Sequence, residues 1–152
     1  MGAVFNGTGE VRAAVGTHLG YSDWLEVTLD RIQAFADATN DHQWIHLDVE
    51  RCASESPYGA PIAHGYLTLS LTSFFLPQII QVNGISFGIN YGANKLRFPS
   101  PVRAGRRIRC GGELLAADDV AGGVQATIRL TVEVEDEDKP ACVVEFLARY
   151  LD

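Results

Sequence analysis

The sequence has few cysteines and few basic residues, and both shortages narrow the classes of protein to which it can belong. The three cysteines, Cys52, Cys110 and Cys142, are an odd number and form no Cys-x-x-Cys pair. This pattern speaks against a disulfide framework and against a zinc ribbon, and it fits the reducing cytoplasm. The net charge of −7 speaks against a general nucleic-acid-binding protein.

Long apolar runs are also missing. The longest, residues 66–82, is interrupted by hydroxyl groups, glutamines and Pro77, and it is too polar for a membrane span of about 20 residues. The first residues contain no basic region followed by an apolar run, so we expect no secretory signal. The sequence therefore predicts a cytoplasmic protein without a membrane anchor.

The length and composition are those of an ordinary folded domain. A chain of 152 residues, of which 47% are hydrophobic and 20% charged, can bury a core without metal ions or disulfides. We expect one domain, residues 1–152, with no internal repeat or linker.

Two helices are predicted from the pattern of apolar residues. Residues 29–39 place their apolar side chains on one helical face, and Thr28 is a suitable N-cap. This helix should end near Thr39, which leaves residues 41–46 on the turn that follows. From His64, the segment HGYLTLSLTSFFL is apolar on every side, so the predicted helix must be wrapped by other structure. Pro77 is expected to close or kink this helix.

Most of the remaining chain is typical of strands. Alternating apolar residues from Val124 to Val134 have the period of a half-buried antiparallel strand. With a short edge strand at residues 24–27, these segments predict an α+β fold, in which a strongly curved antiparallel sheet surrounds one central apolar helix. The expected strands are residues 84–98, 102–115, 123–135 and 140–151, with turns or bulges at Gly111-Gly112 and residues 116–123 and a hairpin tip at residues 135–140.

Chemically active side chains are concentrated in residues 41–46, which contain Asp41, His42 and His46. Turns on rigid scaffolds often present catalytic groups. A solvated turn or a capping aspartate would explain an Asp-His pair equally well, so spacing alone leaves both interpretations open.

A second group, residues 61–65, leads directly into the apolar helix. The first N–H groups of a helix have no intrahelical partner, and they can bind an oxyanion if a small residue such as Gly65 lets a ligand approach. A tight entry into a core helix would explain the glycine as well. We expect His64 to be a structural histidine that bonds a loop carbonyl.

Together these groups suit the addition of water to an enoyl thioester. His46 would take a proton from the water, and Asp41 would accept the water's other hydrogen bond. The amides at the start of the helix would stabilise negative charge on the thioester oxygen, where one donor is typically worth about 3 kcal/mol.

Residues 38–71, ATNDHQWIHLDVERCASESPYGAPIAHGYLTLSL, resemble the MaoC-like dehydratase or hydratase 2 signature, in which Asp-x-Asn-Pro-hydrophobic-His is followed by Ile-Ala-His-Gly. NYGANKLRFPSPVRAGRRIR at residues 90–109 and KPACVVE from Lys139 resemble the nodulation-protein-N-like branch of that family. The resemblance implies a homodimeric single hotdog fold that uses no cofactor or metal. It also implies that Asp41 and His46 are the catalytic pair and that Gly65 supplies the oxyanion amide.

The resemblance is incomplete around the pair. Gln43 replaces the usual Asn and Trp44 the usual Pro, which leaves the third polar contact and the acyl-chain size open. Ser73 falls where the family carries a serine near the catalytic pair, and a small core residue that bonds back to the helix would explain it equally well.

A basic stretch suggests where coenzyme A would bind. Residues 57–111 contain no acidic side chain, and arginine binds phosphate oxygens in a bidentate manner. Each residue taken alone could be an ordinary solvated strand residue. The candidates for phosphate contacts are Lys95, Arg97, Arg103 and Arg106, with Arg107 and Arg109 beside them.

The leading hypothesis is therefore (R)-specific hydration of trans-2-enoyl-CoA to (R)-3-hydroxyacyl-CoA, or the reverse dehydration. An acyl-CoA thioesterase and a non-catalytic acyl-CoA or lipid-signal binder are the alternatives. We expect no metal site, because His42 and His46 lack a third ligand at a recognisable spacing.

Overall fold

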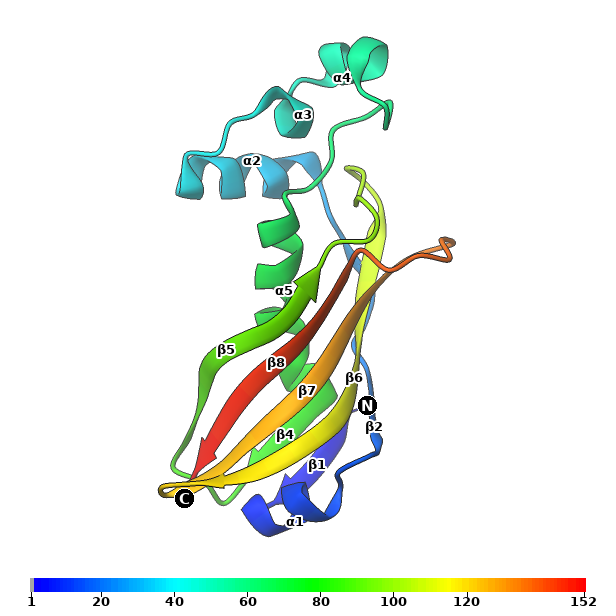
Figure 1. Ribbon diagram of the computed structural model, residues 1–152. Coiled ribbons are helices and arrows are strands. Elements are labelled where there is room, and N and C mark those ends of the chain that lie inside the picture. Colours follow the sequence, from blue (N-terminus) through cyan, green and yellow to red (C-terminus); the bar gives the residue numbers. More distant parts are fainter. Residues whose placement is uncertain (1) are drawn as a thin grey trace.

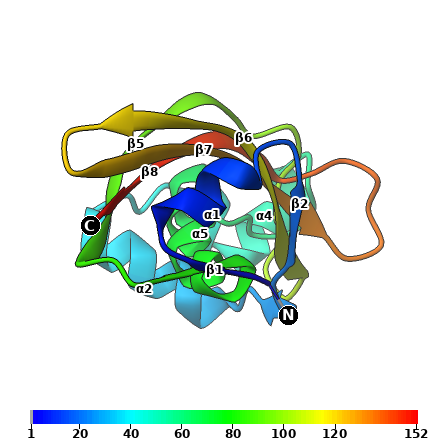
Figure 2. The ribbon, with the colours of Figure 1, turned by 90° about the horizontal axis from the view of Figure 1, so that it is seen from below.

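The computed structural model describes residues 2–152 and consists of a curved sheet wrapped around a helix (Figure 1). The sheet has six strands, in the order β2-β6-β7-β8-β5, with β3 paired to β6, and the paired strands are antiparallel. Seen along its length, the sheet curves over α5 (Figure 2). The predicted α+β architecture is thus confirmed. The strands are β2 (His18–Tyr21), β3 (Leu25–Glu26), β5 (Phe87–Arg97), β6 (Arg107–Val120), β7 (Gly123–Val134) and β8 (Cys142–Leu151).

The central helix is α5 (Gly65–Ile79). The side chains of Leu67, Leu71, Phe75 and Ile79 are all buried, as expected of a helix enclosed by a sheet. Of the two effects expected of Pro77, it does not close the helix at that residue, because it lies within the last turn, which continues to Ile79.

The inner face of the sheet is built from the predicted alternation. In β7, every second residue from Val124 to Val134 is at most 2% exposed. In β8, every second residue from Cys142 to Tyr150 is buried as well. The period of two places one apolar face on α5 and the other toward solvent.

Of the turn or bulge predicted at Gly111-Gly112, the structure has no turn, because both glycines lie in the middle of β6, but the pairing of β6 with β2 shifts register beside Gly112. A Cβ on Gly112 would lie 2.7 Å from Cγ2 of Ile79, and a Cβ on Gly111 would lie 2.7 Å from Cε1 of Tyr21. These glycines therefore permit close approach of neighbours rather than a change of chain direction. The expected bulge in residues 116–123 is represented by a register shift between Leu114 and Ala116, after which β6 continues to Val120.

Three helices lie at one end of α5 (Figure 1). They are α2 (Leu29–Thr39), α3 (Trp44–Leu47) and α4 (Val49–Glu55). The predicted N-cap is confirmed, since Thr28 Oγ1 accepts a hydrogen bond from the Arg31 N–H at 3.1 Å. α2 ends at Thr39, and its C-cap Asn40 has a left-handed φ of 60°, which directs the chain into the segment that carries Asp41.

A parallel two-stranded ribbon at the other end was not predicted. It pairs β1 (Ala3–Asn6) with β4 (Ile80–Asn83), beside α1 (Thr8–Ala13). No helix within the described residues is long and apolar enough to span a membrane.

Candidate active site

A pocket of about 430 Å³ opens where α2, α3 and α5 meet. The segment after α2 contributes Asp41, α3 contributes His46, and the start of α5 contributes Gly65. The two groups that the sequence singled out, residues 41–46 and 61–65, therefore lie together. The lining residues are Phe35, Thr39, Asp41, His46, His64, Gly65, Tyr66 and Phe98.

His46 is held as a single tautomer. Its Nδ1 lies 2.7 Å from the Ile62 carbonyl oxygen, and because a carbonyl only accepts, Nδ1 carries the hydrogen. Nε2 of the neutral ring then has a lone pair available to a proton donor. The side chain is only 7% exposed.

The pKa of His46 lies below its usual value of 6.5, mainly because burial disfavours the charged ring. The hydrogen bond to Ile62 and the carboxylate of Asp41 raise the pKa, whereas the neighbouring His64 lowers it. The balance keeps His46 in the neutral form that a general base requires at neutral pH.

Asp41 lies at the mouth of the pocket, and its side chain is 53% exposed. Its Oδ1 accepts a long hydrogen bond of 3.4 Å from the Gln43 N–H, and its backbone carbonyl accepts one from His64 Nε2 at 3.0 Å. This second bond confirms the expectation that His64 bonds a loop carbonyl. Much of the Asp41 carboxylate remains open to a water molecule.

Gly65 is the first residue of α5, where the N–H groups have no intrahelical acceptor. The ring of Phe98 packs directly on it, and a Cβ at residue 65 would lie 2.8 Å from Cδ2 and Cε2 of that ring. Phe98 was not predicted as a site residue, since a phenylalanine between a strand and a proline gives no signal in the sequence. The glycine is therefore required by packing as well as by any ligand.

The two histidines and the aspartate have potential ligand atoms within 4.8 Å of one another. The rings of His46 and His64 are stacked, however, with centroids 3.8 Å apart and planes at 25°. Lone pairs lie in the ring planes, so two nearly parallel rings do not direct them at one ion. His42 is held elsewhere, by Asp37 at 2.8 Å, and the arrangement gives no support to a metal.

Two other predicted site residues are not brought to this pocket. The side chain of Gln43 is exposed, and only its backbone N–H reaches Asp41. Ser73 is also exposed and lines a different pocket of about 300 Å³, between α5, β5 and β8. The predicted polar contacts from these two side chains are therefore absent from the pocket that holds Asp41 and His46.

The basic stretch is not the positive surface that its sequence suggests, because acidic residues of β7 and the β7–β8 hairpin pair with it. Arg103 and Arg106 both lie within 4 Å of Glu137, at 3.8 and 3.5 Å. Within residues 2–152, Arg97 forms no ion pair. The remaining pairs are Lys95 with Glu145, Arg107 with Glu135 and Arg109 with Glu133.

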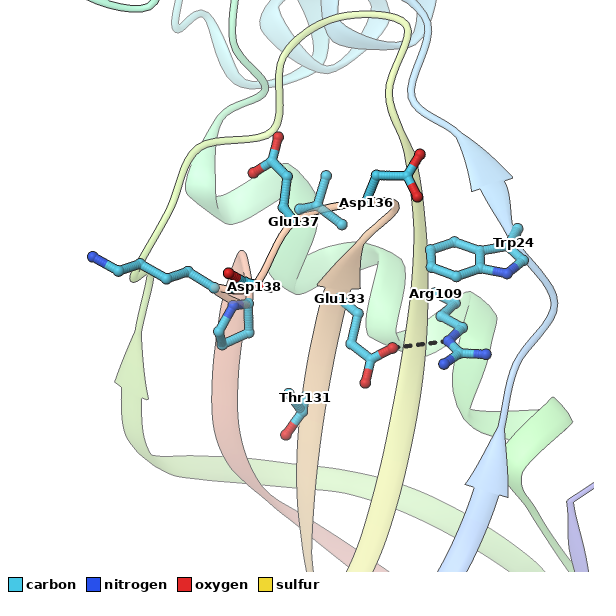
Figure 3. Close-up of a pocket in the computed structure, with 10 residues that line it drawn as sticks. Trp24, Arg109, Thr131, Glu133, Asp136, Glu137 and Asp138 are labelled. Atoms are coloured by element: carbon cyan, nitrogen blue, oxygen red, sulfur yellow. Dashed lines mark hydrogen bonds and ion pairs between the residues drawn. The ribbon is translucent and has the colours of Figure 1, made fainter.

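Figure 3 shows the surface pocket beside these pairs, with a volume of about 670 Å³. The bond from Arg109 to Glu133, 2.9 Å long, crosses it, and the guanidinium also lies 4.8 Å from the centre of the Trp24 ring. The other charged residues that line it are Asp136, Glu137, Asp138 and Lys139, so acidic side chains outnumber basic ones. This pocket is unsuited to an anionic phosphate.

The cysteines offer no nucleophile for thioester cleavage. All three are buried and free. Burial raises the pKa of Cys110 to about 12 and that of Cys142 to about 11, so their thiols stay protonated.

Comparison with known proteins identifies relatives over most of the chain. Residues 10–136 match the MaoC like domain. The 3-hydroxyacyl-thioester dehydratase Z of Mycobacterium tuberculosis (strain ATCC 25618 / H37Rv) is 47% identical over 148 residues, which are 97% of each chain. Nodulation protein N of Rhizobium leguminosarum bv. viciae is 42% identical over 144 residues, covering 91% of this chain and 87% of that protein.

Among solved structures, the (R)-hydratase from A. caviae involved in PHA biosynthesis superposes with a TM-score of 0.72. It is 26% identical and covers 88% of this chain and 94% of its own. The fold is that of the hotdog dehydratases. On the family match and the two relatives, the chain belongs to the MaoC-like dehydratase family.

Proposed function

We propose that the protein hydrates trans-2-enoyl-CoA to (R)-3-hydroxyacyl-CoA and catalyses the reverse dehydration. The observation that carries this proposal is the shared pocket, in which the open Nε2 of His46, the exposed carboxylate of Asp41 and the start of α5 at Gly65 lie together. Relatives named as dehydratases and an (R)-hydratase of the same fold support the reaction class and the stereochemistry.

In the proposed mechanism, one water molecule binds between Asp41 and His46. His46 Nε2 removes a proton as the water oxygen attacks the β-carbon, and Asp41 accepts the other hydrogen bond. The Gly65 N–H stabilises the negative charge that develops on the thioester oxygen. The proton is then delivered to the α-carbon, so the reaction needs no cofactor or metal.

Coenzyme A is the proposed carrier of the acyl group. Arg97 forms no ion pair within the described residues and precedes Phe98, which lines the pocket. Lys95 pairs with Glu145 at 3.7 Å, but its side chain is 77% exposed, so both cations can reach a phosphate at little cost. Arg103 and Arg106 are the weaker of the four candidates, because Glu137 and backbone carbonyls already occupy their donors.

We further propose a homodimer in the cytoplasm. β5 lies at the edge of the sheet and exposes Phe87, Ile89 and Tyr91, which are 54%, 41% and 55% exposed. An exposed apolar edge strand is a liability that a second copy would cover. Light scattering after gel filtration should give a dimer, and Phe87→Asp should weaken it, whereas Val49→Asp on α4 should not. A monomeric wild type would contradict this assembly.

The reaction can be tested with crotonyl-CoA, by following loss of the enoyl thioester and by chiral analysis of the product. We expect the (R)-3-hydroxy thioester from the wild type and at least a hundredfold loss of kcat in Asp41→Asn and His46→Gln. Near-normal rates in both variants would overturn the site. Release of free thiol from saturated acyl-CoA would identify a thioesterase instead, and tight acyl-CoA binding without turnover would identify a binding protein.

A further inference from the structure

His64 is a buried histidine to which the proposed reaction assigns no step. Its side chain is 3% exposed, and the ring lines the pocket between the segment that carries Asp41 and the ring of His46. A buried polar side chain in such a place is costly unless its hydrogen bonds are satisfied. Of the two ring nitrogens of His64, only Nε2 has a hydrogen-bond partner among the described residues.

The tautomer of His64 follows from its partner. Nε2 lies 3.0 Å from the Asp41 carbonyl oxygen, so Nε2 carries the hydrogen and donates it. Nδ1 is buried and has no hydrogen-bond partner among the described residues. Among the described contacts, the ring therefore holds the segment that carries Asp41 through Nε2 alone.

The same ring also constrains His46. The two imidazoles are stacked with centroids 3.8 Å apart, and Phe35 of α2 contacts His64 with centroids 5.0 Å apart. The plane of His46 is thereby fixed from one side by His64, while the Ile62 carbonyl fixes its rotation. Asp41 and His46 do not share a hydrogen bond with each other in the described structure, so His64 is the group that connects them.

We infer that His64 is a positioning residue, which holds Asp41 by a hydrogen bond to its backbone carbonyl and holds His46 by stacking, and so sets the gap that the water must fill. This inference rests on the proposed function. It differs from a purely structural role because His64 also acts on the protonation of His46. The titratable side chains that line the pocket are Asp41, His46, His64 and Tyr66, and α2 contributes only the neutral Phe35 and Thr39.

Within that set, His64 opposes a charge on His46 and Asp41 favours it. Loss of the imidazole should therefore raise the pKa of His46 and move the acid limb of kcat/KM to higher pH. Because burial is the largest cause of the lowered pKa, His64→Leu is the decisive variant: leucine keeps the ring of His46 covered, so a rise in its pKa there reports the loss of the imidazole and not of packing.

The first test needs neither substrate nor variant. Long-range ¹H–¹⁵N correlation NMR of the wild type at neutral pH should show His64 with its hydrogen on Nε2 and His46 with its hydrogen on Nδ1. A His64 ring that carries its only hydrogen on Nδ1 would overturn the inference, because it could not donate to the Asp41 carbonyl. Because this measurement is independent of turnover, it tests His64 even if the proposed reaction proves wrong.

The second test separates the two actions of His64. His64→Gln keeps an amide donor that can reach the Asp41 carbonyl, whereas His64→Leu removes it. We expect kcat to fall by about tenfold or less in the glutamine variant and by a hundredfold or more in the leucine variant, with smaller changes in KM, because the barrier rises about tenfold per 1.4 kcal/mol.

Both variants should raise the pKa of His46, measured by NMR titration, and His42→Gln should leave it unchanged. His42 is a matched control, because its ring bonds Asp37 and does not line the pocket. An unaltered pKa of His46 in a folded His64→Gln protein, or full activity in His64→Leu, would refute the positioning role.

Discussion

The contact between Gly65 and Phe98 allows a quantitative prediction for Gly65→Ala. The added Cβ would lie 2.8 Å from two ring carbons of Phe98, whereas ordinary van der Waals contacts begin at 3.4 Å. Overpacking of this kind costs about 1–3 kcal/mol. Alanine also stabilises the folded state by about 0.4–1 kcal/mol, because it restricts the unfolded chain more than glycine does. Residue 65 can accept alanine in this respect, since its φ is not positive.

We therefore expect Gly65→Ala to lower the free energy of unfolding by about 1–2 kcal/mol, toward the lower figure because Phe98 is 39% exposed and its ring can move. Urea denaturation would measure this loss in the free energy of unfolding. In a Phe98→Ala background the clash is gone, so the same substitution should be neutral or stabilising. Gly9→Ala is the control, because a Cβ there meets nothing within 4 Å.

Activity should respond differently from stability in this cycle. The Cβ at residue 65 narrows the approach to the backbone amide whether or not Phe98 is present, so kcat should stay low in the double variant even where stability recovers. If Gly65→Ala destabilised both backgrounds equally, the contact with Phe98 would not explain the glycine. If kcat recovered together with stability, Gly65 would have no direct part in the oxyanion site.

Three further predictions concern other parts of the molecule. Folding lowers the pKa of His46 from its usual 6.5, so just below that pH the unfolded chain binds more protons than the folded protein, and the free energy of unfolding should rise with pH up to about 6.5. For the same reason the acid limb of kcat/KM should inflect below pH 6.5, and an inflection above 6.5 would contradict the lowered pKa. Arg97→Gln should raise KM for acyl-CoA several-fold with little change in stability. Arg103→Gln removes the ion pair with Glu137 and the hydrogen bond to a backbone carbonyl, and it should change KM less. Equal changes of KM in the two variants would show that Arg97 is no more available to a phosphate than Arg103. Thr28→Ala should cost about 1 kcal/mol in thermal unfolding through loss of the α2 N-cap, and an unchanged Tm would argue against the cap.

The elements with a strong period could be predicted from the sequence. Alternation identified β7 and β8, and the 3.6-residue spacing with Thr28 identified α2, because both patterns report which face is buried. The ribbon of β1 and β4 was missed, since strands of four residues are too short to show a period and their pairing is set by distant contacts.

The glycines of β6 were only partly interpreted correctly, because the pairing with β2 shifts register there but the chain does not turn. A Gly-Gly pair is a turn signal when only local sequence is considered, but it also occurs where a strand is approached closely by a helix or a side chain. Gly112 is needed because Ile79 of α5 packs against it, and that contact joins residues far apart in the chain. Local patterns do not contain such information.

The candidate site was predicted better than its surroundings. Asp41, His46 and Gly65 were each identified as site residues, because polar residues in turns and glycines at helix starts are conspicuous in sequence, and the pocket brings all three together. His64, which lines the same pocket, was expected to be structural only. Ser73 was placed by resemblance alone, and the exposed face of α5 carries it to a different pocket.

Charge distribution shows why the basic stretch was misjudged. An acid-free run in sequence predicts a positive surface only if no acidic strand pairs with it, and β6 pairs with β7 in a register that sets Arg109 directly opposite Glu133. Opposite charges at facing positions stabilise a sheet, so these arginines have a structural use. Arg97 lies outside that ladder, on β5 beside the pocket. The cation most available to a phosphate is thus the one that the acidic hairpin does not reach, and affinity for coenzyme A should depend on a few edge residues rather than on the overall charge of −7.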